Sequence, residues 1–333
     1  MSTAVVILNF NGKNHLSTFL PSILEHTKEA TIWVVDNAST DGSVAFMKSD
    51  FPQVKLLILE QNYGFAEGYN RALNQISADF YVLLNSDVEV TKNWLTPLIN
   101  ELESSPKIAA VQPKILSYKN KNTFEYAGAG GGFLDKFGYP FCRGRIFDYC
   151  EEDLGQYDES TPVFWGTGAC LAIKSSVYHN VGGLDGRFFA HMEEIDLCWR
   201  IQSSGQTVIY EPASIVYHLG GGTLHKSNPQ KTFLNYRNCL AMMFKNLPVS
   251  SAVPTIFFRL ILDGVSAFKL LFEGNGKEFL AILRAHFGFY AMIPYLFKKS
   301  KGVPRSKAGL YKCSVVWQYF VKGIKKYSSL PDV

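Results

Sequence analysis

The chain has 333 residues, enough for one large hydrophobic core or two smaller ones, and 47% of them are hydrophobic while 19% are charged. It begins with an apolar run that ends at polar Asn9, without the basic segment and cleavage site of a secretory signal, so we expect a cytoplasmic protein. Its six cysteines are scattered without a CxxC spacing, which argues against a disulfide framework and is typical of free thiols in a reducing compartment.

The charge is unevenly distributed along the chain. From residue 251 onward there are 13 Lys and Arg against 4 Asp and Glu, a net charge of +9, so that the preceding residues carry −5 of the overall +4. This asymmetry predicts two parts with different surroundings.

The first hundred residues alternate apolar runs with segments of helical periodicity. Strands are predicted at residues 5–8, 31–36, 54–59 and 80–84, and helices at residues 14–27, 66–76 and 94–102. This alternation indicates a doubly wound parallel sheet. Ligands of such sheets bind beyond the carboxyl ends of the strands, so the polar residues that follow each strand are candidates for a site.

The middle of the chain is less regular. Strands are predicted at residues 107–111, 164–173 and 208–217, and residues 123–144 are rich in glycine and aromatic side chains. The strand at 164–173 contains small residues that could pass close beneath a bound sugar, so we expect sugar contacts from Trp165, Gly166, Thr167 and Gly168.

Asp87 follows the buried strand at residues 80–84, within the polar turn Asn85-Ser86-Asp87. A carboxylate there can hold a hard divalent cation, which in turn can hold a diphosphate; the alternative is a solvated turn. His218 ends another predicted strand and precedes Gly220, Gly221 and Gly222. A neutral imidazole could complete the coordination of that cation, and the bare glycine backbone could approach a phosphate, although a lone histidine is more often structural.

Asp36 ends the second predicted strand and is followed by a polar turn. An acidic residue at that point can accept hydrogen bonds from a ribose hydroxyl or a base N–H. The alternative is a capping turn, with Ser39 or Asp41 as the N-cap of the next helix. No GxGxxG motif follows the first strand, which argues against a dinucleotide-binding fold.

Three acidic residues within four positions, Glu193, Glu194 and Asp196, form the most charged segment of this part. Their mutual repulsion raises a pKa and suits one of the glutamates to act as a general base. The alternative is an acid-rich first helical turn with Asp196 and Arg200 as an ion pair. We expect that structural role for Asp196 and Arg200, and the choice between Glu193 and Glu194 stays open.

The basic end of the chain contains two apolar segments of nearly bilayer length, residues 253–272 and 279–297. Both carry charges near mid-span, among them Arg259, Asp263 and Arg284, which are costly inside a bilayer. We therefore predict amphipathic helices that lie on an anionic membrane surface. Helices packed on the catalytic part or in a dimer interface are the second interpretation, and membrane spans the last.

Taken together and in this order, these segments resemble the family 2 inverting glycosyltransferases with a GT-A fold, among them the bacterial rhamnosyltransferase-like members. The resemblance covers about residues 3–245 and rests on residues 5–11, 35–43, 62–70, 83–87, 168–170, 182–185, 193–200 and 216–218. It implies a GT-A domain at 1–245, with a nucleotide-binding half at 1–106 and an acceptor-binding half at 107–245. A helical, basic, membrane-associating extension follows at 246–333.

The resemblance also implies roles for individual residues. Asp87 would hold Mg²⁺ or Mn²⁺ with His218, and Asn85 replaces the usual first aspartate of that motif. Glu194 stands at the position of the general base, and residues 236–238 are a diphosphate or packing contact. The residues implied in nucleotide binding are Asn9, Asn11, Asp36, Asn37, Asn62, Gly64, Asn85 and Ser86.

The implied reaction is a single displacement with inversion. A sugar passes from a nucleoside-diphosphate donor to a glycan or lipid-linked acceptor, for a cell-surface polysaccharide, at the inner face of the cytoplasmic membrane. We expect no nucleic-acid partner. The alternatives are a sugar-phosphate nucleotidyltransferase and a non-catalytic sugar- or lipid-binding protein.

Overall fold

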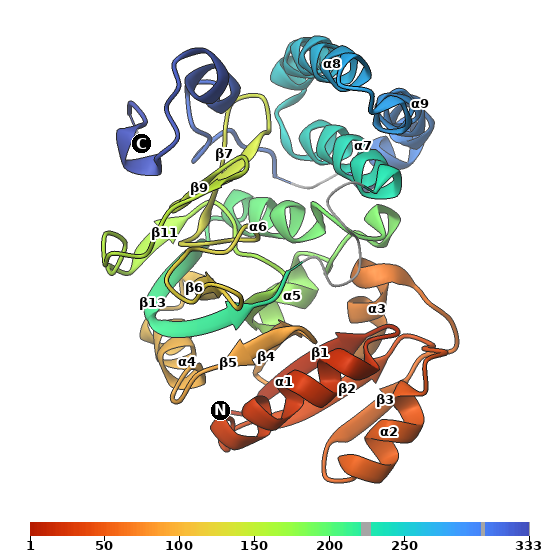
Figure 1. Ribbon diagram of the computed structural model, residues 1–333, viewed down its shortest axis with the longest axis vertical. Helices are drawn as coiled ribbons and strands as arrows, with labels where there is room; N and C mark the ends of the chain where they lie inside the picture. Colours follow the sequence, from red (N-terminus) through yellow and green to blue (C-terminus); the bar gives the residue numbers. More distant parts are fainter. Residues whose placement is uncertain (221–227, 301–303, 333) are drawn as a thin grey trace.

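The computed structural model describes residues 1–220, 228–300 and 304–332. Its first part is built from parallel strands in the order β3-β2-β1-β4, as the alternating pattern predicted (Figure 1). The strands and their connecting helices are β1 (Thr3–Asn9), α1 (Lys13–His26), β2 (Thr31–Asp36), α2 (Ser43–Asp50), β3 (Lys55–Ile58), α3 (Gly64–Leu73) and β4 (Phe80–Asn85).

The sheet continues beyond β4 with strands of both directions. Antiparallel β12 lies between β4 and β6, so β6 and β13 run in the same direction as β1–β4 and the sheet is mixed but mostly parallel. The further elements are β5 (Val88–Val90), α4 (Leu95–Ser104), β6 (Ile108–Ser117), β11 (Thr161–Val163), β12 (Cys170–Lys174) and β13 (Thr207–His218). The strand predicted at 164–173 is wrong in its first part, because residues 164–169 form a loop before β12.

Both faces of the sheet are covered. Alternating residues of β4 divide between two hydrophobic clusters: Tyr81 and Leu83 pack with residues of α3 and α6, whereas Val82 and Leu84 pack with residues of α1 and α4. A continuous apolar run such as that of β4 is what a strand buried on both faces requires. The carboxyl ends of the strands are thereby held rigidly.

The glycine-rich segment forms a second, four-stranded antiparallel sheet that the sequence did not predict. Its strands are β7 (Gly132–Leu134), β8 (Pro140–Cys142), β9 (Arg145–Ile146) and β10 (Tyr149–Cys150). Residues 304–332 return to this sheet: the N–H of Tyr311 donates to the carbonyl of Leu134 at 2.8 Å, and that of Val315 donates to Asp135 at 2.9 Å. This last segment includes the π-helical turn η2 (Trp317–Val321) and the 3₁₀ turn η3 (Tyr327–Ser329).

Helices form a layer over one face of the sheet and beyond it. They are α5 (Ser175–Asn180), the 3₁₀ turn η1 (Gly186–Phe188), α6 (Glu193–Ser203), α7 (Pro229–Asn246), α8 (Val249–Phe272) and α9 (Gly276–Lys299). Helices α7, α8 and α9 lie together at one end of the molecule (Figure 1). The extension predicted to begin at residue 246 is helical: α7 ends at Asn246, α8 begins at Val249, and both α8 and α9 pack against α7. Among the described helices, α9 alone has the length and apolar composition of a membrane span.

Candidate active site

Side chains from the ends of β1 and β2 meet at the carboxyl edge of the sheet. Asn9 donates from Nδ2 to Oδ2 of Asp36 at 3.0 Å and to Oγ of Ser39 at 3.1 Å, and Asp36 accepts the N–H of Ser39 on Oδ1 at 2.8 Å. Asn9 and Asp36 are buried, and Oδ1 of Asn9 has no hydrogen-bond partner among the described residues. Gly12 leaves this oxygen room, because a Cβ there would lie 2.4 Å from it.

Three further residues predicted to bind the nucleotide hold the surrounding loops together. Oδ1 of Asn11 accepts the N–H of Thr40 at 2.7 Å and so joins the loops after β1 and β2. Asn37 is buried and donates from Nδ2 to Oδ1 of Asn62 at 3.1 Å and to the carbonyl of Gly64 at 3.0 Å. Asn11, Asn37 and Asn62 thus fix the shape of this edge through their own hydrogen bonds.

Gly64 begins α3 with a φ of +76°, and a Cβ at this position would lie 2.5 Å from the ring of Phe189. The carbonyl of Phe189 accepts the N–H groups of Phe65 at 2.7 Å and Ala66 at 3.2 Å. These first N–H groups of α3 are therefore already satisfied by the chain itself. Gly64 therefore allows the start of α3 to approach the loop at Phe189, which lies far away in the sequence.

His218 lies between two carboxylates. Its Nε2 is 3.2 Å from Oδ1 of Asp87, and its Nδ1 is 3.1 Å from Oε2 of Glu125. All three side chains are buried. Nδ2 of Asn85 is 3.5 Å from Nε2 of His218, and Ser86 lies in the turn between β4 and β5 with part of its surface exposed. The structure therefore brings Asp87 and His218 together, as predicted from the two strand ends.

The charges of this cluster support one another. Burial disfavours the imidazolium of His218, but the charge of Asp87 and the hydrogen bonds to both carboxylates raise its pKa to about 10. Burial likewise opposes ionisation of Asp87 and Glu125, yet the adjacent imidazolium holds the pKa of each carboxyl below its ordinary value. The cluster is thus charged at neutral pH.

The sequence analysis did not find Glu125. It lies in an irregular segment after β6, carries no motif and is separated by 93 residues from the histidine that it contacts. Gly220 leaves it room, because a Cβ there would lie 2.6 Å from Oε1 of Glu125. The neighbouring Gly221 and Gly222, which were predicted to let a phosphate approach, lie outside the described residues.

The loop at residues 166–169 connects the Asp87 turn with helix α6. The N–H of Asn85 donates to the carbonyl of Ala169 at 3.0 Å, and the N–H of Gly166 donates to Sγ of Cys198 on α6 at 3.4 Å. Gly168 lies against Phe65, since a Cβ there would be 2.9 Å from its ring. The small residues predicted here are needed for this close packing.

The structure does not bring the ring of Trp165 to a sugar-binding surface. The side chain is buried, its Nε1 donates to the carbonyl of Phe133 at 3.0 Å, and the ring covers the position that a Cβ of Gly132 would occupy. Thr167 is also buried, and its N–H donates to Oε1 of Gln112 at 2.8 Å. The sugar contacts predicted from Trp165 and Thr167 are therefore corrected to packing roles for these side chains.

Glu193 and Glu194 begin α6 and differ in exposure. Glu193 is buried, whereas part of Glu194 reaches the surface, and Oε2 of each lacks a hydrogen-bond partner among the described residues. Burial raises the pKa of Glu194 to about 7, and burial together with the charge of Glu194 raises the pKa of Glu193 further. The surroundings of Glu193 thus favour its protonated form, and Glu194 changes its protonation state near pH 7.

The loop before Glu193 is strained and firmly held. Phe189, His191 and Met192 have φ values of 67°, 70° and 73°, a region that non-glycine residues rarely adopt. Asn238 on α7 is buried and donates from Nδ2 to the carbonyls of residues 188, 190 and 191 at 2.8–2.9 Å. Residues 236–238 were expected to contact either the diphosphate or the protein interior. Asn238 makes a contact of the second kind. Such strain is typical of sites where a side chain is held in a required position.

A family model described as Glycosyl transferase family 2 matches residues 4–174, about half of the chain. The chain belongs to this family. It is a glycosyltransferase, which confirms the resemblance seen in the sequence. The match includes Asp87 and the loop at 166–169, whereas Glu194 and His218 lie beyond it.

Two named relatives of this family 2 glycosyltransferase are a rhamnosyltransferase and a hexosyltransferase. The chain is 27% identical over 233 residues to an N-acetylglucosaminyl-diphospho-decaprenol L-rhamnosyltransferase of Mycobacterium tuberculosis, an alignment covering 64% of this chain and 75% of that enzyme. It is 22% identical over 297 residues to the low-salt glycan biosynthesis hexosyltransferase Agl10 of Haloferax volcanii, covering 86% and 89% of the two chains.

Solved structures show the same fold. GalNAc-T7, determined with UDP, GalNAc and Mn²⁺, superposes with a TM-score of 0.57 at 19% identity, over 75% of this chain and 48% of that one. The mannosyltransferase PcManGT from Pyrobaculum calidifontis, determined with GDP-Man and Mn²⁺, superposes with a TM-score of 0.53 at 14% identity, over 86% of each chain. The GT-A fold predicted for this family 2 glycosyltransferase is thereby confirmed.

Proposed function

We propose that this glycosyltransferase moves a hexosyl group, such as rhamnose, from a nucleoside-diphosphate sugar to a hydroxyl of a glycan or lipid-linked acceptor, with inversion and with Glu194 as the base. The observation that carries this proposal is the position of Glu194. It is the partly exposed member of the glutamate pair, and its helix is joined to the Asp87 turn through the loop at 166–169.

In this mechanism Glu194 takes the proton of the acceptor hydroxyl while the hydroxyl oxygen forms a bond to the anomeric carbon. The bond from that carbon to the donor's phosphate oxygen breaks, and its electron pair leaves with the nucleoside diphosphate. One carboxylate is sufficient, unlike in a glycoside hydrolase, which needs two. A pKa near 7 leaves much of Glu194 ionised and basic enough to accept the proton.

Asp87 and His218 fit the requirements of Mg²⁺ or Mn²⁺. An ionised carboxylate and the imidazole of His218 converge at 3.2 Å, and Asn85 lies beside them. His218 would lose its Nε2 proton to a cation bound here, because only the neutral ring can act as a ligand. No set of three or more His, Cys, Asp and Glu side chains that could hold a metal ion was found in the part of the chain that the structure describes. Such cations commonly take one or two protein ligands and complete their shell with phosphates and water. When bound, the cation would supply positive charge against the departing diphosphate.

Asn9 and Asp36 are the residues that we propose to contact the nucleotide directly. Oδ1 of Asn9 is available, and the carboxylate of Asp36 has acceptor capacity beyond its two bonds. We assign Asn11, Asn37, Asn62 and Gly64 to the loops that shape this edge of the sheet, and Ser86 to the diphosphate beside Asp87.

We further propose that the enzyme works in the cytoplasm at the inner face of the cytoplasmic membrane, in synthesis of a cell-envelope polysaccharide. The name of the mycobacterial relative includes a lipid diphosphate acceptor. The net charge of +9 from residue 251 onward supports attraction to an anionic membrane surface.

The experiment that tests the proposed function is a thermal-shift screen with UDP, TDP and GDP, each with and without Mn²⁺. One nucleotide is expected to raise the Tm in a Mn²⁺-dependent way, because a ligand at a hundred times its Kd stabilises the native state by about 2.7 kcal/mol. Asp87→Ala should abolish the rise, whereas Asp50→Ala, at an exposed position of α2, should retain it. No rise with any nucleotide would favour the non-catalytic sugar- or lipid-binding alternative.

Glu125 is expected to orient His218 for the cation. Glu125→Ala should weaken Mn²⁺ binding by about 10–100-fold, since a carboxylate on the second ring nitrogen fixes the orientation of a metal-binding histidine. Glu125→Gln should lose less, because its amide oxygen can still accept the Nδ1–H. Titration calorimetry with Mn²⁺ in the presence of the bound nucleotide measures this difference. Equal affinities in both variants and the wild type would reduce Glu125 to a packing role.

A further inference from the structure

Helix α8 has its polarity reversed relative to a helix on the surface of a soluble protein. Its buried positions include Arg259, Asp263 and Ser251. Its outer positions are apolar and are exposed by 50–67%: Val253, Phe257, Phe258, Ile261, Val265 and Phe268. Exposed apolar residues are common singly, but a continuous face of large ones marks a binding surface.

The charged side chains inside α8 contact each other and the body of the enzyme. Nε of Arg259 donates to Oδ1 of Asp263 at 2.6 Å, and its Nη1 donates to the carbonyl of Phe137 at 2.9 Å. The hydroxyl of Tyr139 donates to the same oxygen of Asp263 at 3.3 Å. Arg259 and Asp263, which lie near the middle of an apolar segment in the sequence, therefore bind α8 to the hairpin between β7 and β8. They also determine which face of the helix points outward.

The apolar face extends beyond α8. The ring of Phe268 lies 5.8 Å from that of Phe279 on α9, and Nζ of Lys269 lies 5.3 Å from the ring centre of Phe320 in η2. Trp317 and Phe320 are more than half exposed. We call the exposed apolar residues of α8, α9 and η2 together the apolar cap.

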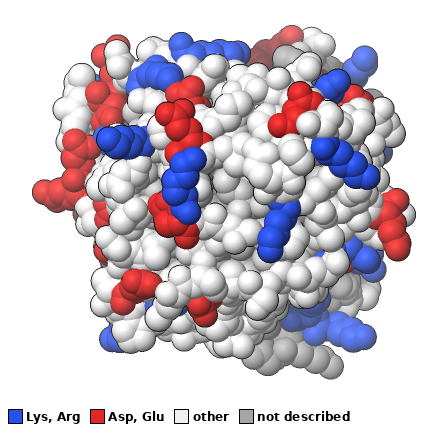
Figure 2. Space-filling model, turned by 90° about the horizontal axis from the view of Figure 1, so that it is seen from below, with Lys and Arg blue, Asp and Glu red and all other residues white. Residues whose placement is uncertain are grey.

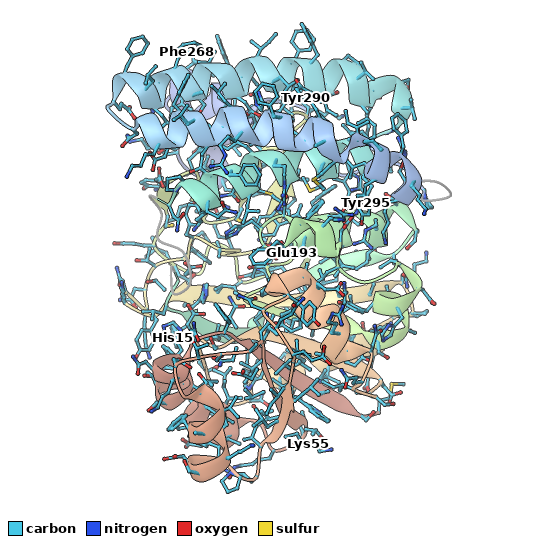
Figure 3. The ribbon with its side chains drawn as sticks, turned by 90° about the vertical axis from the view of Figure 1, so that its right-hand side faces the viewer. His15, Lys55, Glu193, Phe268, Tyr290 and Tyr295 are labelled. Carbon is cyan, nitrogen blue, oxygen red and sulfur yellow. The ribbon has the colours of Figure 1, made fainter. Side chains whose placement is uncertain are left out.

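The apolar cap occupies one end of the molecule. Figure 3 shows Phe268 projecting outward from α8, Lys55 near the opposite end and Glu193 between them. The opposite end has an ordinary surface, on which acidic and basic side chains are interspersed (Figure 2). Exposed basic side chains lie at the ends of the cap's helical segments, namely Lys269, Lys277, Lys298, Lys299 and Lys322.

We infer that the apolar cap inserts flat into the interfacial layer of an anionic lipid leaflet and does not span it. Large apolar side chains flanked by lysines are the chemistry of interfacial helices, which bind anionic headgroups while their apolar face enters the acyl region. A span by α8 is disfavoured because the internal contacts of Arg259 and Asp263 would have to break and leave both charges in hydrocarbon. A span by α9 would have to give up the side chains that it buries inside the protein, among them Ile282, Ala285 and Phe289. This inference deepens the proposed function, since it names the surface that would present a lipid-linked acceptor.

Flotation of the full chain with lipid vesicles tests whether the apolar cap binds a membrane. Wild-type protein is expected to float with phosphatidylcholine vesicles containing phosphatidylglycerol, and less with phosphatidylcholine alone. Phe257→Asp and Phe268→Asp should each lower the partition into vesicles at least about tenfold, because a phenylalanine that enters the lipid is replaced by a charge. Leu154→Asp is the matched control, since Leu154 is exposed outside the cap, and it should float like the wild type.

The depth to which the apolar cap enters the lipid is measured by the quenching of Trp317 fluorescence with brominated lipids. Strong quenching that Trp317→Phe removes is expected for an inserted cap. The inference is overturned if the wild type stays unbound, if the Phe→Asp variants float equally well, or if light scattering shows a dimer that Phe268→Asp dissociates. Nucleotide binding by the wild type separates the two proposals: binding without flotation overturns the cap alone, and flotation without binding overturns the transfer function alone.

Discussion

Glu194→Gln is expected to lower kcat/KM by about 10²–10⁴-fold, the usual contribution of a general base. The amide cannot accept the acceptor's proton, whereas its size and its place at the start of α6 stay the same. Binding of the nucleotide and Mn²⁺ should be unchanged, because these ligands depend on the Asp87 edge of the site. Release of nucleoside diphosphate from a sugar nucleotide measures the loss.

Glu193→Gln is the matched control. The pKa of Glu193 is raised well above its ordinary value by burial and by Glu194, which favours its protonated form, so an amide should replace it at little cost. The reverse result, with activity lost in Glu193→Gln and kept in Glu194→Gln, would transfer the role of base to Glu193.

The pKa of Glu194 also predicts how kcat/KM depends on pH. A base works only when deprotonated, so kcat/KM should rise with pH through the folded-state pKa of Glu194 near 7. The same raised pKa means that ionised Glu194 destabilises the folded state. The free energy of unfolding should therefore fall as the pH rises from the ordinary pKa of a glutamate toward 7.

Lys245→Met is expected to lower the free energy of unfolding by about 3–5 kcal/mol, the usual effect of removing one partner from a buried ion pair. Nζ of Lys245 lies 2.7 Å from Oδ2 of Asp185 and 2.7 Å from Oδ2 of Asp196, and all three side chains are buried. Methionine fills the volume but leaves Asp185 without a cation. Arg200 still pairs with Asp196 at 2.8 Å, so Asp185 carries most of the loss.

Urea denaturation of the full chain measures this change. Arg71→Met provides the comparison, because Arg71 forms an exposed pair with Glu67 on α3 and its loss should alter stability by less than about 1 kcal/mol. Equal stability of Lys245→Met and the wild type would show that the buried charges are neutralised by other means.

The parts that could be predicted from the sequence are those that local pattern determines. Buried strands give continuous apolar runs, and the residue after each run lies at the ligand edge of a parallel sheet, which is how Asp36 and Asp87 were found. The ion pair of Asp196 and Arg200 also follows from local spacing, and the structure has it at 2.8 Å.

The remainder depends on which partner a side chain meets far along the chain. Asn37 and Trp165 have residue types suited to ligand contacts, but their polar atoms bond to Asn62 and to the carbonyl of Phe133. Glu125 has no local signature because its role comes from His218 alone. Arg259 and Asp263 interrupt an apolar segment in the sequence, and only the fold shows that they face inward together.

The return of the last residues to the second sheet has a consequence for synthesis of the protein. The N–H of Tyr311 bonds to Leu134, and that of Tyr327 bonds to Glu151 at 3.0 Å, so these contacts of the second sheet form only after residue 327 has been made. At about 5–20 residues per second a ribosome takes roughly ten to thirty seconds to travel that distance. Helices α8 and α9 emerge within this interval. The apolar faces of α8 and α9 are therefore exposed beside the ribosome, and to any membrane near it, before these contacts of the second sheet have formed.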